Sequence, residues 1–442
     1  MKLSNINREI LALSIPAIVS NITTPLLGLI DVAIVGHIGS AVYIAAIALG
    51  GAVMNMLYWI FGFLRLGASG VTAQAFGAKD TVAADAVLYR GLVIAAGISL
   101  LIMVAQGFLT DRVLEFMDAD PASANPASRY VSICIWGAPS VLATYTLSGW
   151  MLGMQYSKGP MWIALVTNIV NIAASLIFVF WLGYDIAGVA TGTCIAQWAG
   201  IIFGAILTVL KFHPSHPDWK KVFKAEDIKR FFAINRDIFL RTLCLVAVTL
   251  WFTHAGAVQG TLVLAANALL MQFFMLFSYF TDGFAFAGEA LSGKYMGERN
   301  PDMLKKSIES LIKTGVVLSV IFTTAYFIAG DTIMHILTSD SGVVDTAKKY
   351  FIWILVIPVA GFTAFTWDGI FGGLTLTRGG LLLPMALSAM LFFASYALLT
   401  PLYGNHGLWA SFIIYCASRG IIQTIYFQTH KKYLYRNEQQ GH

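Results

Sequence analysis

The sequence predicts an all-α integral membrane protein with twelve transmembrane helices in two pseudo-symmetric six-helix lobes. Hydrophobic residues make up 58% of the 442 positions and charged residues only 12%, whereas soluble domains carry roughly 25% charged residues. Apolar runs of about 20 residues, enough to cross a hydrocarbon core of about 30 Å, recur along the chain. A run of that length satisfies its backbone hydrogen bonds in lipid only as a helix.

The predicted helices form two sets of six, one on each side of a hydrophilic segment. The first apolar run is longer than that of a signal peptide and lacks a cleavage site of small residues, so we expect it to be retained. The spans are 8–36, 42–66, 88–110, 126–154, 160–181, 186–210, 230–254, 262–288, 310–328, 345–373, 379–400 and 407–429. We predict an N-terminal lobe over 1–210, a cytoplasmic linker over 211–229, a C-terminal lobe over 230–429 and a cytoplasmic tail over 430–442.

Lysine and arginine predict the orientation, because cytoplasmic loops hold an excess of them. The segment HPSHPDWKKVFKAEDIKR, 213–230, and the tail both carry several basic residues. We therefore place both termini in the cytoplasm, which agrees with an even number of helices. The same bias explains the net charge of +5, so no nucleic-acid partner is expected.

An internal repeat appears when the second half of the sequence is laid over the first so that Gly369 falls on Gly149. In this repeat register Gly373 falls on Gly153, and the loop MGERN falls on FGAKD. Because each repeat has an even number of helices, both halves enter the membrane in the same direction. Two similar lobes can form a cleft that faces either side of the membrane, which is the geometry that alternating access requires. The GxxxG pairs indicate closely packed helices.

Asp31 is the most unusual polar residue in the predicted spans. A charged side chain costs at least about 2.5 kcal/mol at the centre of a membrane helix, and no lysine or arginine lies within a helical turn or two of Asp31. Such a carboxyl group can bind and release a proton, or it can be a structural acid with a distant partner. Pro16, in the same helix, removes a backbone hydrogen bond and marks either a hinge or an ordinary membrane-helix proline.

Two further polar groups lie in the spans. Asn168, Asn171 and Ser175 share one face of a helix, and Thr193 lies on the next helix; they either form a pocket with Asp31 or hold helices together. Near the cytoplasmic side, charged residues predict ion pairs that close the inner face or, alternatively, a cation or substrate site. This second group contains Arg65, Arg241, Asp282, Glu289 and Asp368.

Enzyme motifs are missing from the sequence. It contains no GxxxxGK[ST] phosphate loop, no HExxH and no GxSxG, and its four cysteines form no CxxC pair. We expect no cofactor, no metal centre and no enzymatic activity, so transport would draw on an ion gradient.

The sequence resembles the multidrug and toxic compound extrusion (MATE) family, specifically its DNA-damage-inducible (DinF) branch. The resemblance rests on NITTPLLGLIDVAIVGHIGS and FLRLGASGVTAQAFGAKD in the first lobe. The second lobe adds NRDIFLR, DGFAFAGEALSGKYMG, WDGIFGG and GNHGLWASF with Arg419. The match implies a twelve-helix antiporter that exports amphiphilic, often cationic compounds in exchange for H+ or Na+.

By position, the resemblance gives roles to several residues. Asp31 matches the family's essential helix 1 aspartate, Pro16 the proline at which helix 1 bends, and Asn171 and Thr193 polar partners of that aspartate. Ser175 stands where many relatives have a second aspartate, which favours H+ over Na+ at Asp31. Asp368 matches one acid of a second cation site, but the seventh helix has no acid within its membrane interior.

The sequence therefore predicts a proton-coupled multidrug exporter in the cell's inner (cytoplasmic) membrane. In this hypothesis, protonation of Asp31 drives a rearrangement of helix 1. We expect a monomer whose partners are amphiphilic small molecules and membrane lipid. The alternative is a flippase for lipid-linked oligosaccharides with the same two-lobe plan.

Overall fold

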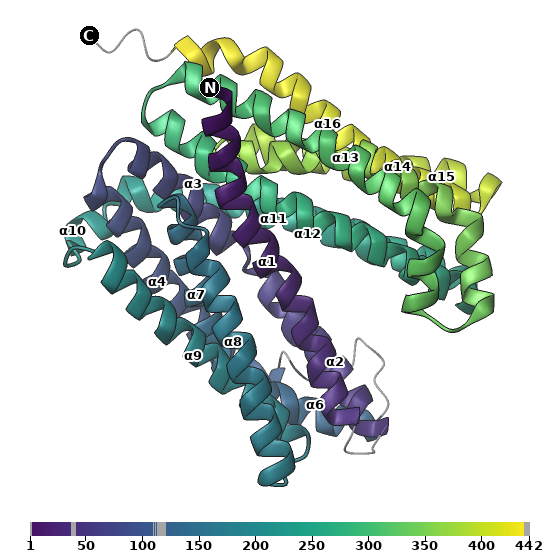
Figure 1. Cartoon of the computed structure of the whole chain (residues 1–442). Helices are drawn as coiled ribbons and strands as arrows, with labels where there is room; N and C mark the ends of the chain where they lie inside the picture. Colours follow the sequence, from purple (N-terminus) through teal and green to yellow (C-terminus); the bar gives the residue numbers. More distant parts are fainter. Residues whose placement is uncertain (1, 37–40, 109, 111, 113–120, 437–442) are drawn as a thin grey trace. The chain divides into compact units, whose positions relative to one another are not determined.

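The computed structural model describes residues 2–36, 41–108, 110, 112 and 121–436, and these residues are mainly helical (Figure 1). Within these ranges, 11 helical segments are long and apolar enough to cross a membrane. Helix α1, Lys2–Gly36, adds a further helix of 35 residues. The predicted all-α membrane class is confirmed, and the number of long helices agrees with the twelve expected.

The helices of the N-terminal half begin and end close to the predicted spans, with one break. The predicted span 42–66 comprises α2 and the start of α3, because a turn interrupts the helix at Phe61 and Gly62. The elements after α1 are α2 Ala41–Ile60, α3 Phe63–Gly77, α4 Thr81–Val104, α6 Pro121–Cys134, η1 Ile135–Gly137, α7 Ala138–Gly153, α8 Lys158–Leu176, η2 Ile177–Trp181, α9 Ile186–Phe212 and α10 Trp219–Val222.

Several helices of the C-terminal half are longer than their apolar runs. The predicted span 310–328 is the middle of α13, whose polar first turn starts after Asn300; the Asn300 side chain accepts a hydrogen bond from the backbone of Met303 at 3.1 Å. Hydropathy detects only the apolar part of such a helix. The elements are α11 Ala225–Val258, α12 Thr261–Gly297, α13 Pro301–Leu337, α14 Ser341–Gly373, η3 Thr377–Leu382, α15 Leu383–Tyr403 and α16 Asn405–Arg436.

The chain forms two compact units. One contains residues 15–231, and the other contains residues 232–442 together with residues 1–14. Each unit has its own core: Trp150 is fully buried in the first, and Trp367 and Trp409 are among the largest buried side chains of the second. Helix α1 therefore contributes to both units, and Pro16 lies just after the boundary. Residues 437–442 of the predicted tail lie outside the described residues.

The predicted linker packs against the first unit. Asp85, on α4, accepts hydrogen bonds from the backbone and the hydroxyl group of Ser215 at 2.9 and 2.8 Å. Farther along α4, Arg90 donates to the carbonyl of Val222 at 2.9 Å and forms an ion pair with Asp227 at 3.4 Å. The segment after α9 is thus fastened to α4.

The internal repeat is visible in backbone conformation. Non-glycine residues seldom adopt a positive φ, yet Lys79 and Arg299 have φ of 58° and 51°, and Gln155 and Thr375 have φ of 60° and 56°. The members of each pair coincide in the repeat register. The loops of the two halves therefore share the same unusual turns, although the residues in them differ.

The repeated GxxxG glycines make equivalent helix contacts in the two units. A Cβ atom on Gly149 of α7 would lie 2.2 Å from the carbonyl oxygen of Arg65 on α3. A Cβ atom on Gly369 of α14 would lie 2.1 Å from the carbonyl oxygen of Ala285 on α12. Arg65 and Ala285 also coincide in the repeat register. Only glycine permits this close approach, as the spacing indicated.

Candidate functional site

Asp31 is a buried carboxylate late in α1. Only 6% of its surface is exposed, and its Oδ1 atom has no hydrogen-bond partner among the residues that the structure describes. Buried polar atoms are paired in the great majority of cases. An acid in this state is a candidate for proton or cation binding.

A set of polar side chains connects Asp31 to α8 and α9. Asn171, on α8, donates through Nδ2 to the hydroxyl oxygen of Thr193, on α9, at 2.9 Å. Tyr130, on α6, lies close enough to both Thr193 and Asp31 to interact with them electrostatically. Cys134, one turn beyond Tyr130, is close to Asp31 as well. We call Asp31, Tyr130, Asn171 and Thr193 the acidic pocket.

Tyr130 is a pocket residue that the sequence did not point to. A Cβ atom on Gly50 of α2 would lie 2.6 Å from Cδ1 of the Tyr130 ring, so the ring fills space that only a glycine leaves free. The repeat pairs Tyr130 with Tyr350, but that match signals packing rather than function. Tyr130 is recognised as a pocket residue only from its contacts in the folded structure.

The other predicted pocket residues, Asn168 and Ser175, have different surroundings. Asn168 donates to the backbone carbonyl of Thr23 at 3.1 Å and so fastens α8 to α1. Ser175 is fully buried, and its hydroxyl oxygen lies 2.5 Å from where Gly192 would carry a Cβ atom. A larger side chain at 175 would press against α9.

Three of the predicted pocket residues have buried oxygen atoms without a hydrogen-bond partner among the described residues. In the part of the chain that the structure describes, Oδ1 of Asp31, Oδ1 of Asn171 and Oγ of Ser175 are all buried without a hydrogen-bond partner. These carboxylate, carbonyl and hydroxyl oxygens are groups that can accept a proton, a hard cation or a water molecule.

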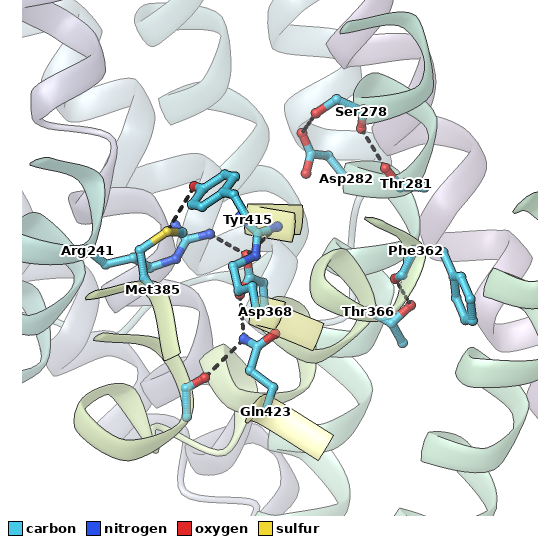
Figure 2. Close-up of polar contacts among 12 residues, drawn as sticks. Arg241, Ser278, Thr281, Asp282, Phe362, Thr366, Asp368, Met385, Tyr415 and Gln423 are labelled. Carbon is cyan, nitrogen blue, oxygen red and sulfur yellow. Dashed lines mark hydrogen bonds and ion pairs between the residues drawn. The ribbon is translucent and has the colours of Figure 1, made fainter. Parts of the chain in front are cut away.

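In the second unit, Asp368 on α14 is surrounded by donors. Its Oδ2 atom forms an ion pair with Arg241 of α11 and lies 3.7 Å from Nη2 of Arg419. Its Oδ1 atom accepts a hydrogen bond from Gln423 at 2.8 Å. Figure 2 shows Asp368 between Arg241 and Gln423. We call Arg241, Asp368 and Arg419 the arginine cluster.

The arginine cluster contains one of the predicted inner-side ion pairs. Among the other residues of that predicted group, Asp282 accepts a hydrogen bond from Ser278 at 3.3 Å, and Figure 2 shows this pair apart from Asp368. Glu289 is buried on α12, and Arg65 is on α3 of the first unit. Whether these residues close the inner face stays a prediction.

The fold matches solved membrane transporters. The Vibrio cholerae MATE transporter VcmN in its bent form aligns with a TM-score of 0.87 at 17% identity, covering 99% of this chain and 98% of VcmN. The outward-facing form of a multidrug resistance MATE family transporter aligns with a TM-score of 0.80 at 20% identity, covering 97% of this chain and 96% of that one. This protein therefore has the fold of a multi-pass membrane transporter.

The sequence comparisons establish the family. A family model described as MatE matches residues 16–177 and 237–401, which together are most of the chain. DNA damage-inducible protein F of Escherichia coli is 33% identical over 430 residues, covering 97% of this chain and 93% of the relative. Multidrug resistance protein MdtK of Edwardsiella ictaluri is 25% identical, covering 95% and 94%. The chain belongs to the MatE family, whose members are transporters rather than enzymes.

Proposed function

We propose that this transporter is a secondary active antiporter of the inner membrane, which exports amphiphilic, often cationic compounds in exchange for protons. The observation that carries the proposal is the buried Asp31 with an unpaired Oδ1 atom among the described residues. The Asp31 carboxylate loses its negative charge when it binds a proton, and the acidic pocket provides hydroxyl and amide groups that can respond.

Proton binding would change the contacts of Asp31 in two ways. A protonated carboxyl group becomes a hydrogen-bond donor and loses its attraction for a cation. Its contacts with the pocket then rearrange, α1 moves about Pro16, and a bound organic cation is released. Because α1 contributes residues 1–14 to the second unit, movement of this helix would be felt in both units.

Protons suit this pocket better than sodium ions. A hard metal cation needs several oxygen ligands, and this chain has a serine, Ser175, at the position where the family resemblance implies a second acid. Sodium bound at Asp31 is the alternative, and separate gradients distinguish the two ions. Dye uptake into proteoliposomes should follow an imposed proton gradient and should not follow a sodium gradient of the same size.

The direct test of the proposal is Asp31→Asn, assayed as dye transport by everted membrane vesicles. We expect transport to fall to background while the amount of protein in the membrane is unchanged. Asp345→Asn, which alters an exposed acid of α14, is the matched control and should transport normally. Full transport by Asp31→Asn would refute the proposal.

A lipid flippase is the second candidate, and the two arginines of the second unit favour it. Arg241 and Arg419 share one acid, and a pyrophosphate group is recognised by such clustered guanidinium groups. Thermal stabilisation of the purified protein by a pyrophosphate-linked lipid, without stabilisation by a cationic dye, would favour this candidate over drug export.

A further inference from the structure

The arginine cluster contains one more positive charge than negative charge. Both guanidinium groups approach the same oxygen, Oδ2 of Asp368, while Oδ1 is taken by Gln423. One carboxylate therefore serves two arginines. Removing a charge from water without a full partner is costly, so the second guanidinium group needs a counterion.

Each arginine also has an N–H donor that has no acceptor among the described residues. The Nε atoms of Arg241 and Arg419 are both buried without a hydrogen-bond partner there. Only 5% of Arg419 is exposed, so water reaches it poorly. Buried donors left unpaired cost free energy, and an anionic oxygen can supply the missing charge and the missing acceptor together.

The surroundings of the cluster suit an organic anion better than a hydrated inorganic ion. The rings of Phe365 and Tyr415 lie with their centroids 5.3 and 5.8 Å from the Arg419 guanidinium carbon. The side chain of Arg241 is 17% exposed, so the cluster reaches the surface of the chain. A ligand can therefore place its anionic group on the arginines and its apolar body against the rings.

We propose that the arginine cluster binds the carboxylate group of small aromatic or amphiphilic organic acids. Guanidinium groups match a carboxylate in charge and in fork-like geometry. Asp368 then acts as a built-in competitor that keeps the arginines paired when no ligand is bound, and not as a ligand for a coupling cation. This inference concerns binding alone and does not depend on proton-coupled export.

The test uses three ligands of the same shape and different charge: benzoate, benzamide and benzylammonium. Their dissociation constants are measured from thermal unfolding of the purified full-length protein in neutral detergent at constant ionic strength. We expect benzoate to bind at least about tenfold more tightly than benzamide, and any binding of benzylammonium to depend on Asp31 and not on the arginine cluster. Equal binding of benzoate and benzamide by the unaltered protein overturns the proposal, and this result requires no variant.

Variants locate the site. Arg241→Gln and Arg419→Gln should each weaken benzoate binding by at least about tenfold. Arg236→Gln is the matched control, because Arg236 lies on the same helix as Arg241 but is 61% exposed and paired with Asp237; it should bind benzoate normally. Benzoate binding that persists in both cluster variants would place the site elsewhere and refute the assignment.

The variant Asp368→Asn should change benzoate binding in the opposite direction to the arginine variants. Removal of the competing carboxylate should strengthen benzoate binding by about tenfold. If Asp368 instead holds a cation, the unaltered protein will bind benzylammonium and the variant will lose it, which would overturn the proposal. A short-chain phosphatidic acid provides a last comparison: stabilisation by this lipid but not by benzoate would identify a lipid headgroup site and overturn the organic-acid proposal.

Discussion

Asp31 is a buried acid of one repeated half and Asp368 a largely buried acid of the other, and their surroundings are opposite. Asp31 has an oxygen atom without a partner among the described residues, whereas both oxygens of Asp368 are engaged by donors. Neither acid has an acid at the equivalent position of the other half, because the repeat register places Trp251 on Asp31 and Ser148 on Asp368. The two halves therefore share their backbone turns and helix contacts but not their charged side chains.

The physical reason is that scaffold and site obey different constraints. A positive φ or a glycine against a neighbouring carbonyl is fixed by sterics, so a change there disturbs the helix packing. A polar side chain facing a pocket can change without moving the backbone. Trp251 illustrates this freedom, since its ring packs against those of Phe393 and Tyr396, with centroid distances of 5.7 and 5.8 Å. The two sites therefore differ in charge: Asp31 contributes a negative charge, whereas the arginine cluster carries one excess positive charge.

The largest expected effect comes from neutralising the two acids separately. Asp368→Asn should lower the free energy of unfolding by about 3–5 kcal/mol, because it leaves the buried Arg419 and the largely buried Arg241 without their acid. Asp31→Asn should cost less than about 1 kcal/mol, because Asp31 has no ion pair with the residues that the structure describes. Denaturant titration in mixed micelles measures both. Similar losses for the two variants would mean that Asp31 has a basic partner and that the contrast is false.

Substitutions at the repeated glycines test the part of the comparison that is symmetric. Gly149→Ala and Gly369→Ala should each destabilise the protein by about 2 kcal/mol, because each new methyl group would overlap a backbone carbonyl of the neighbouring helix. Gly51→Ala is the control, since a Cβ atom there has nothing within 4 Å. A large difference between the two repeat variants in the same titration would show that the helix contacts are not equivalent.

Sequence features predicted the scaffold well because lipid leaves few alternatives. Hydropathy located the long helices, but it missed the polar extension of α13 at Asn300 and the break between α2 and α3, since neither depends on apolar content. For the site, Asp31 is the lone charged residue of a long apolar run, and the structure shows that it is buried. Tyr130 could not be predicted, because its place in the pocket depends on a glycine from another helix.

Charge partners were predicted only in part, for a similar reason. The sequence placed Arg241 and Asp368 in one group, and the structure pairs them. It gave no means to see that Arg419, from α16, approaches the same oxygen. The distance between residues on different helices depends on helix rotation and depth, which composition and periodicity do not fix.

Tyr130 offers a functional test of the acidic pocket, with its repeat equivalent as the control. Tyr130→Phe removes the hydroxyl group near Asp31 and Thr193 and should slow dye transport about tenfold, the effect of losing about 1.4 kcal/mol. Tyr350→Phe should leave transport within about twofold, since the ring of Tyr350 packs on His406 and can keep doing so. Equal effects in the proteoliposome assay would mean that the hydroxyl group has no special role beside Asp31.

The smallest effect concerns two helix caps at equivalent positions. The side chains of Asp80 and Asn300 accept hydrogen bonds from the backbone of Ala83 and Met303 at 2.9 and 3.1 Å. Asp80→Ala and Asn300→Ala should each cost about 1 kcal/mol. Because the caps lie in different units, the losses should add in the double variant to within about 0.5 kcal/mol. A clear departure from additivity in denaturant titration would show that the two caps are energetically coupled and not independent.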